Sequence, residues 1–113
     1  MLSRENRITK DKEFDRAFKS GQSFYGKVFG LKSVSNDLDL IRFGILINTK
    51  VSKKAVVRNK LRRQIRGILS AVRPELKTGK DIVIIVFPLI LEKSFLEIKE
   101  LLLSGMKKIK AFK

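Results

Sequence analysis

The sequence contains no cysteine and no histidine among its 113 residues. Without cysteine, disulfide bonds and thiolate metal sites are excluded. Without histidine, imidazole general-base catalysis and the usual nitrogen ligand for metals are excluded as well. The chain therefore has few ways to catalyse a reaction through its own side chains.

Long hydrophobic runs are also missing. The longest run, residues 82–87, has the length of a strand and falls well short of the ~18 residues of a membrane span. Residues 1–7 lack the apolar core of a secretory signal. We therefore expect a cytoplasmic protein that does not enter the membrane.

Acidic residues are few, and one segment of the chain has none. The chain has 26 Lys and Arg against 11 Asp and Glu, which gives a net charge of +15. Residues 41–73 contain ten of the basic residues and no acidic one, so they supply +10 and the remainder supplies +5. The hydrophobic fraction, 43%, is ordinary for a folded domain, so the charge does not indicate disorder. Positive charge concentrated in this way indicates a polyanionic partner.

The basic segment has the periodicity of an amphipathic helix that ends near Pro74. Its apolar side recurs at helical spacing and consists of Val57, Leu61, Ile65, Ile68, Leu69 and Val72. On the other side Arg58, Arg62 and Arg66 form a row in which like charges repel by roughly a few tenths of a kcal/mol per pair. A row without interspersed acids favours a phosphate-binding surface over a merely solvated charged face. The candidate residues of this surface are Lys50, Lys53, Lys54, Arg58, Asn59, Lys60, Arg62, Arg63 and Arg66.

Aromatic residues gather near the N-terminus, beside several lysines and arginines; they are Phe14, Phe18, Phe24, Tyr25 and Phe29. Rings four residues apart on a short helix more often belong to a core, but recognition of single-stranded RNA needs exposed rings beside cations. Both readings stay open. The role of Asn59 is equally open, as a contact to a ribose or base edge or as a polar filler.

The first half of the chain predicts a helix followed by strands. The helix covers residues 9–20, and a period-two segment, 23–34, follows it. Gly26 and Gly30 interrupt this segment and suggest a bulge or a bend. A short strand over residues 41–47 is expected to form a hairpin with it.

The second half predicts a strand and a helix after the basic helix, within one α+β domain over residues 1–113. Residues 81–87 form a β-branched run typical of a strand covered on both faces. Ser94 and Glu97 have the spacing of a capping box that opens the last helix. Strand, basic helix and strand make a crossover with parallel strands, and the general rule makes such a crossover right-handed.

The acidic residues form no catalytic pair that the sequence reveals. A two-metal nuclease needs several converging carboxylates, and the spacing does not supply them. We therefore assign no catalytic residue and no metal ligand to the protein itself.

The central motif, Arg58-Asn59-Lys60 followed by Arg62-Arg63 and Arg66, resembles the Arg-Asn-Arg motif of the protein subunit of bacterial ribonuclease P. The resemblance covers essentially the whole chain: Asn6-Arg7-Ile8, the first-helix segment from Glu13 to Gly21, Arg42-Phe43-Gly44 and the final strand and helix also fit. Lys60 stands where the family usually has arginine. It keeps the positive charge but lacks the planar pair of guanidinium donors. Lys53-Lys54 departs from the usual Gly-Asn.

The resemblance implies an α/β two-layer sandwich of αβββαβα order, with a mixed sheet of about four strands and a left-handed crossover, a fold also seen in a ribosomal protein domain. It implies a ribonucleoprotein that removes the 5′ leader of precursor tRNA, in which a large RNA supplies the active site and binds the Mg²⁺ ions. The protein, one per RNA, would bind that RNA through the basic helix. It would bind the leader through a cleft lined by Phe14, Phe18, Phe29 and Lys32.

Two other classes of protein remain as alternatives. A ribosomal or nucleoid protein would bind nucleic acid through the same basic helix without taking part in cleavage. A membrane-surface protein would use the basic side and the apolar side of that helix together, but the apolar side is better used in a core.

Overall fold

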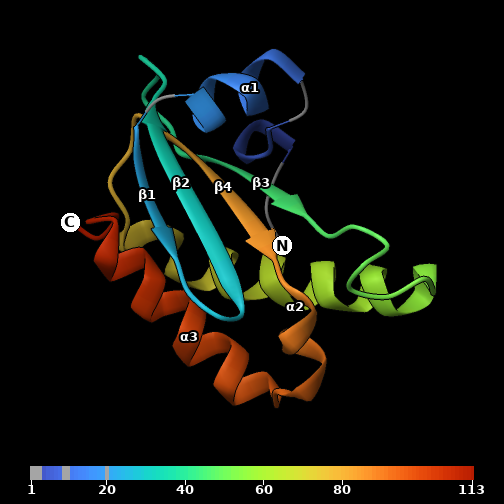
Figure 1. Cartoon of the computed structure of the whole chain (residues 1–113). Coiled ribbons are helices and arrows are strands. Elements are labelled where there is room, and N and C mark those ends of the chain that lie inside the picture. Colours follow the sequence, from blue (N-terminus) through green and yellow to red (C-terminus); the bar gives the residue numbers. More distant parts are fainter. Residues whose placement is uncertain (1–3, 9–10, 20) are drawn as a thin grey trace.

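Three α-helices pack against a four-stranded mixed sheet in the computed structural model of the chain (Figure 1). The structure describes residues 4–8, 11–19 and 21–113, without the side chains of residues 11, 13, 18 and 19. The helices are α1 (Asp11–Lys19), α2 (Ala55–Val72) and α3 (Phe95–Lys108), with the 3-10 turns η1 (Arg4–Asn6), η2 (Arg73–Glu75) and η3 (Pro88–Glu92). The strands are β1 (Gln22–Tyr25), β2 (Phe29–Ser35), β3 (Arg42–Leu46) and β4 (Lys80–Val86). Among the described residues, no helix is long and apolar enough to cross a membrane.

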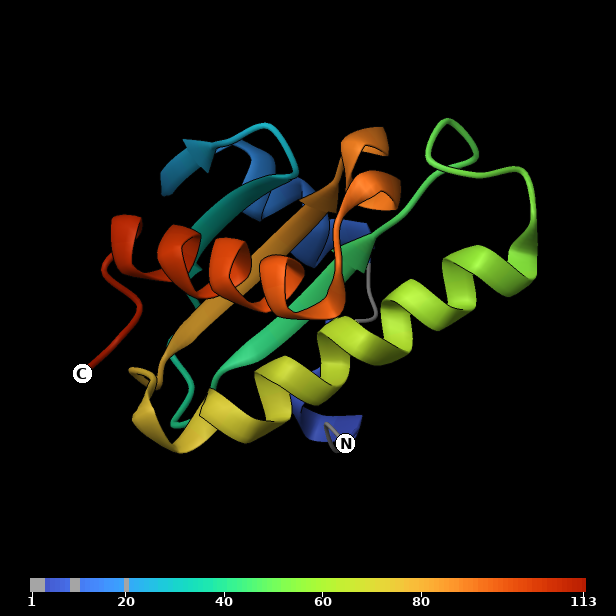
Figure 2. The same cartoon turned by 90° about the horizontal axis from the view of Figure 1, so that it is seen from below.

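The α+β class and the αβββαβα order are confirmed, and α2 forms the predicted crossover. The strand order is β1-β2-β4-β3, with β4 parallel to β3 and antiparallel to β2. With the strands pointing up and α2 towards the viewer, β4 lies to the left of β3 (Figure 2). The crossover is therefore left-handed, as the family resemblance implies and against the general rule.

The predicted hairpin between residues 23–34 and 41–47 is wrong. The first segment folds as two strands, because the chain turns after β1 and the N–H of Gly26 donates to the carbonyl of Phe29 at 2.8 Å. β2 then has β1 on one edge and β4 on the other, so neither edge is left for β3. β3 pairs instead with β4, which follows α2 in the sequence.

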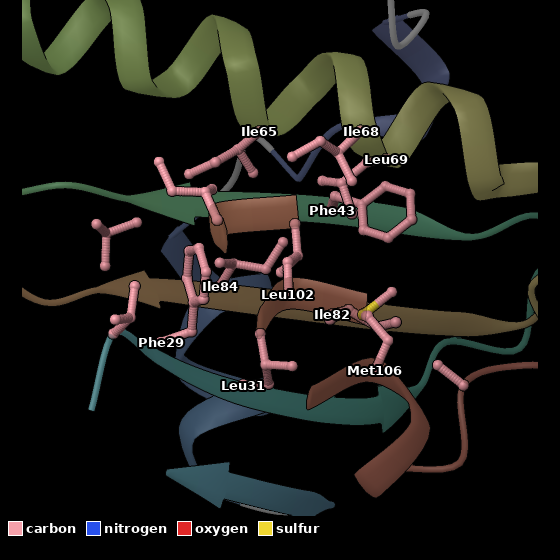
Figure 3. Close-up of a cluster of buried hydrophobic side chains, with 14 of the residues drawn as sticks. Phe29, Leu31, Phe43, Ile65, Ile68, Leu69, Ile82, Ile84, Leu102 and Met106 are labelled. Atoms are coloured by element: carbon pink, nitrogen blue, oxygen red, sulfur yellow. The ribbon is translucent and has the colours of Figure 1, made fainter. Parts of the chain in front are cut away.

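Apolar clusters lie on both faces of the sheet. The larger one fills the space between the sheet and the two helices α2 and α3, where Ile65, Ile84 and Leu102 meet (Figure 3). The smaller one lies under α1 and includes Ala17 and Val83. Alternation along β4 sorts its side chains between the two faces. α1 thus adds a partial third layer to the sandwich, and its position matters for the site described below.

A buried carboxylate ties α1 to the sheet. Asp81 accepts hydrogen bonds from Arg42 Nε and Nη2 at 2.8 and 2.7 Å, from Asn36 Nδ2 at 2.9 Å and from Arg16 Nη2 at 3.2 Å. Burial by itself raises the pKa of Asp81. The hydrogen bonds from Arg42 and Asn36, with the charges of Arg42 and Arg16, outweigh it and hold that pKa below its usual value. One side chain thereby joins α1, the loop before β3, β3 and β4.

The predicted capping box is present at the start of α3. Ser94 Oγ accepts from the N–H of Glu97 at 3.2 Å, and Glu97 Oε1 accepts from the N–H of Ser94 at 2.9 Å. We expect Ser94→Ala to lower the free energy of unfolding by about 1 kcal/mol, because it leaves a helix N–H without its acceptor. Urea denaturation measures the loss, with Ser104→Ala on an exposed turn of the same helix as the control. Equal effects of the two changes would contradict a capping role.

Candidate nucleic-acid interface

α2 turns one apolar face to the core and the rest of its surface to solvent. The predicted apolar residues Leu61, Ile65, Ile68, Leu69 and Val72 are buried, and Val57 is partly buried. The predicted amphipathic helix is therefore confirmed. Since the core holds this face against the sheet, the basic side chains project from a rigid element.

The basic residues predicted for this surface lie on α2 and on the loop before it. Lys50, Lys53, Lys54, Asn59, Lys60 and Arg63 are exposed, and Arg58, Arg62 and Arg66 are partly exposed. The basic face is the name used below for six of them: Arg58, Asn59, Lys60, Arg62, Arg63 and Arg66. Within the described part of the chain, no Asp or Glu forms an ion pair with these side chains. Their charge is thus available to an external polyanion.

Hydrogen bonds within the protein orient two arginines of the basic face. Arg62 Nη1 donates to Asn59 Oδ1 at 3.0 Å, and Arg58 Nη1 donates to the carbonyl of Ser52 at 2.8 Å. Asn59 therefore has a definite role in the free protein as the acceptor that positions Arg62. Asn59 and Arg62 line a hollow of about 300 Å³ together with Arg63 and Arg66. Three arginines around one hollow can bind phosphate oxygens through their guanidinium groups.

The N-terminal segment brings a further arginine to this region. Arg7 lies beside β3, where it forms a bridge with Phe43. The pKa of Arg66 is lowered, first by burial and then by the charges of Arg7 and Arg62. An anion bound among such like charges relieves their repulsion. Sequence analysis missed the position of Arg7, because no local spacing connects it to α2.

The residues predicted to line a leader cleft do not all lie on one face of the sheet. The ring of Phe14 packs on β3 against Gly44, where an added Cβ would collide with it. Phe14 is partly buried in the cluster under α1, so its ring serves the core as well as the surface. The side chain of Phe18 lies outside the described residues.

The assignment of Phe29 to this cleft is wrong. Phe29 is 3% exposed and belongs to the cluster under α2 and α3 (Figure 3). Phe14 packs against the other cluster, on the opposite face of the sheet. The cause is the alternation of side chains along β2, which sends Phe29 and Leu31 to one face and Lys32 to the other.

Tyr25, unlike Phe29, is exposed, and it lies on the face of the sheet that α1 partly covers. Tyr25 as a residue is 56% exposed, and its ring lies over β2, 3.0 Å from the position that a Cβ of Gly30 would occupy. Lys32 Nζ lies 5.6 Å from the centre of this ring, a cation–π distance. An exposed ring beside a cation, on the same face as Phe14, fits a single-stranded nucleic acid. The pairing of β1 with β2 brings these residues together, and the sequence alone did not predict that pairing.

The described side chains of the site are basic, polar and aromatic groups that can bind a polyanion. Among the described residues, no three His, Cys, Asp or Glu side chains are close enough to hold a metal ion. Asp81, whose side chain is completely buried, accepts hydrogen bonds from Arg42, Arg16 and Asn36. The arrangement can therefore hold a polyanion in place through the basic face and through Tyr25 and Lys32.

Comparison with known proteins places this geometry in one family. A family model described as Ribonuclease P matches residues 2–110. The ribonuclease P protein component of Bacillus mycoides is 34% identical over 115 residues, which cover 96% of this chain and 99% of that protein. The component of Synechocystis sp. is 56% identical over 50 residues, which cover 44% of this chain and 40% of the relative.

Solved structures agree with the sequence comparison. The ribonuclease P protein of Staphylococcus aureus superposes with a TM-score of 0.89 at 30% sequence identity, over 96% of this chain and 98% of that one. The basic face of α2, and the face of the sheet beside α1 that carries Tyr25 and Lys32, are thus parts of a fold shared with that protein. The chain belongs to the bacterial ribonuclease P protein family, whose members are the protein subunits that work with a ribonuclease P RNA in the endoribonuclease of tRNA 5′ processing.

Proposed function

We propose that the basic face of α2 binds the ribonuclease P RNA and that this RNA performs the cleavage. One observation carries the proposal: Arg58, Arg62 and Arg66 follow one another along a helix backed by the core, and no described acid pairs with them. The repulsion within this row lowers stability unless phosphates offset it. Arginine also grips phosphate with a planar pair of donors.

We further propose that the substrate is precursor tRNA and that its 5′ leader lies across the face beside α1. Tyr25 and Lys32 support this proposal, because a leader is single-stranded and its unstacked bases can lie on an exposed ring. Lys32 would hold a neighbouring phosphate. The basic face and the leader site lie on different elements, so one protein can contact both RNAs at once.

Among the described residues, no three acidic side chains lie close together. We propose that the RNA subunit binds the Mg²⁺ ions through its own oxygens. One basic face per chain supports one protein for each RNA in the complex. We propose the cytoplasm as its location, since bacterial precursor tRNA is transcribed there.

Reconstitution tests the proposed function. The full chain is mixed with a bacterial ribonuclease P RNA at low Mg²⁺, and release of the leader from precursor tRNA is followed over time. We expect the protein to stimulate leader release, because bound protein neutralises phosphate repulsion that Mg²⁺ would otherwise have to screen. A ribosomal or nucleoid protein would bind the RNA without stimulating release, and that outcome would overturn the proposal.

Tyr25→Ala is expected to weaken binding of precursor tRNA to the reconstituted complex by about 1 kcal/mol or more, the value of one base stacked on an aromatic ring. Mature tRNA, which has no leader, should bind the variant and the original protein equally well. Tyr25→Phe keeps the ring and should keep the affinity. If Tyr25→Ala weakens binding of both tRNAs to the same extent, Tyr25 does not contact the leader.

A further inference from the structure

A groove that the basic face does not explain lies between α2 and α3. It has a volume of about 510 Å³, within the range of sites that bind small organic molecules. The N-terminal half of α2 forms one wall, and η3 with the start of α3 forms the other. Its apolar lining consists of Val56, Val57, Leu61, Ile90, Leu91, Phe95 and Ile98, and its polar lining of Lys60, Gln64 and Lys93.

The apolar side chains at the mouth of this groove are unusually exposed. Val56 is 80% exposed and Phe95 49% exposed, although both lie in well-formed helices. The capping box of Ser94 and Glu97 fixes the backbone next to Phe95, so the ring is held at the groove by an ordered element. An ordered aromatic ring that is half in water loses little entropy when a flat ligand stacks on it.

The positive charge around the groove favours an anionic ligand. Lys60 and Lys93 are its charged lining residues in the described chain, and both are cations. Lys60 also belongs to the basic face, so the groove continues the surface proposed to bind RNA. A second copy of this chain would bring the same lysines together, and the net charge of +15 on each copy opposes such pairing. An anionic partner with flat, partly apolar groups fits both features.

We propose that an unpaired base of the ribonuclease P RNA enters the groove between α2 and α3. The base stacks on the ring of Phe95, and the amide of Gln64 forms hydrogen bonds with its edge. Lys60 and Lys93 hold the phosphates on either side of the inserted nucleotide. This inference rests on the proposed function, since it extends the contact of the basic face with the same RNA by one specific subsite.

Equilibrium binding of the full chain to ribonuclease P RNA tests the inference. Phe95→Ala is expected to weaken binding at least about fivefold, because a stacked base is lost. It should leave the dependence of affinity on salt unchanged, because no charge is removed. Leu96→Ala is the matched control: Leu96 is 62% exposed on the same turn of α3 but does not line the groove. Equal affinities of the two variants would overturn the inference, provided that their circular dichroism and melting temperatures match.

A cross-linking measurement identifies the occupant directly. The full chain with p-benzoylphenylalanine in place of Phe95 is irradiated in the reconstituted complex, and the cross-linked residue is mapped. A cross-link to one unpaired nucleotide of the RNA supports the inference. A cross-link to a second copy of the chain, or none to RNA, overturns it.

Arg62→Ala separates failure of this inference from failure of the proposed function. If Arg62→Ala weakens RNA binding and reduces its salt dependence while Phe95→Ala changes nothing, only the groove is wrongly assigned. If Arg62→Ala also changes nothing, the basic face does not bind this RNA, and the proposed function fails with it.

Discussion

Replacing Arg62 and Arg63 together with glutamate is expected to weaken binding of the ribonuclease P RNA at least about 100-fold at ~0.15 M salt. Both side chains line the hollow on the basic face, and the change turns two attractive contacts with phosphate into two repulsive ones. Like charges placed together at an interface cost several kcal/mol, and about 1.4 kcal/mol corresponds to a tenfold change in affinity. Neither residue belongs to the core, so the fold should persist.

Lys77→Glu with Lys113→Glu is the matched control, because it changes the net charge by the same amount. Both lysines are exposed and lie beyond the C-terminal end of α2, away from the basic face. We expect this control to lose less than about tenfold in affinity, through the long-range field alone. Equal losses in the two double variants would mean that net charge, and not the arrangement on α2, drives binding.

Asp81→Ala is expected to lower the free energy of unfolding by about 3–5 kcal/mol, the largest effect on stability that we expect from one side chain. The Asp81 carboxylate is completely buried, and the Arg42 side chain, which donates two hydrogen bonds to it, is 16% exposed. Removing the carboxylate leaves a guanidinium largely out of water without its counter-ion. It also frees Asn36, which donates to Asp81 and to the carbonyl of Leu40 and so shapes the loop before β3. Urea denaturation measures the loss.

The same network predicts how stability depends on pH. The pKa of Asp81 is lower in the folded protein than its usual value, so the unfolded chain takes up the proton first as pH falls. The stability that Asp81 contributes is complete above the unfolded pKa of about 3.9, and it is lost as pH falls from there through the folded value. Asp81→Asn removes this titration, so the difference in unfolding free energy between the original protein and the variant should shrink below about pH 4. A constant difference down to pH 2.5 would show that the Asp81 pKa is not depressed.

Local pattern predicted most of the secondary structure. The apolar spacing of α2 identified each residue that the helix buries, because the period of a helix depends only on neighbours along the chain. The capping box of α3 was readable for the same reason. The strand pairing could not be predicted in this way. The hairpin expected between residues 23–34 and 41–47 is wrong because β4, which is distant in the sequence, pairs with both β2 and β3.

Three features of the candidate sites appeared only with the tertiary structure. Tyr25, and not Phe29, is exposed on the face of the sheet beside α1, because side chains alternate between the two faces along β1 and β2. Arg7 reached the neighbourhood of Arg66 through pairing of the N-terminal segment with β3. The groove between α2 and α3 formed from segments that are separated by the whole of β4.

The sequence by itself determined that one helix is apolar on one side and basic on the other, and that its motif is that of a ribonuclease P protein. Both properties reside in residues close together along the chain. Only the tertiary structure decided the left-handed connection through α2, the burial of Asp81 among Arg16, Asn36 and Arg42, and the side of the sheet on which each aromatic ring lies. These features depend on contacts between segments far apart in the sequence. Such contacts form only when the whole core is assembled, so no local pattern predicts them.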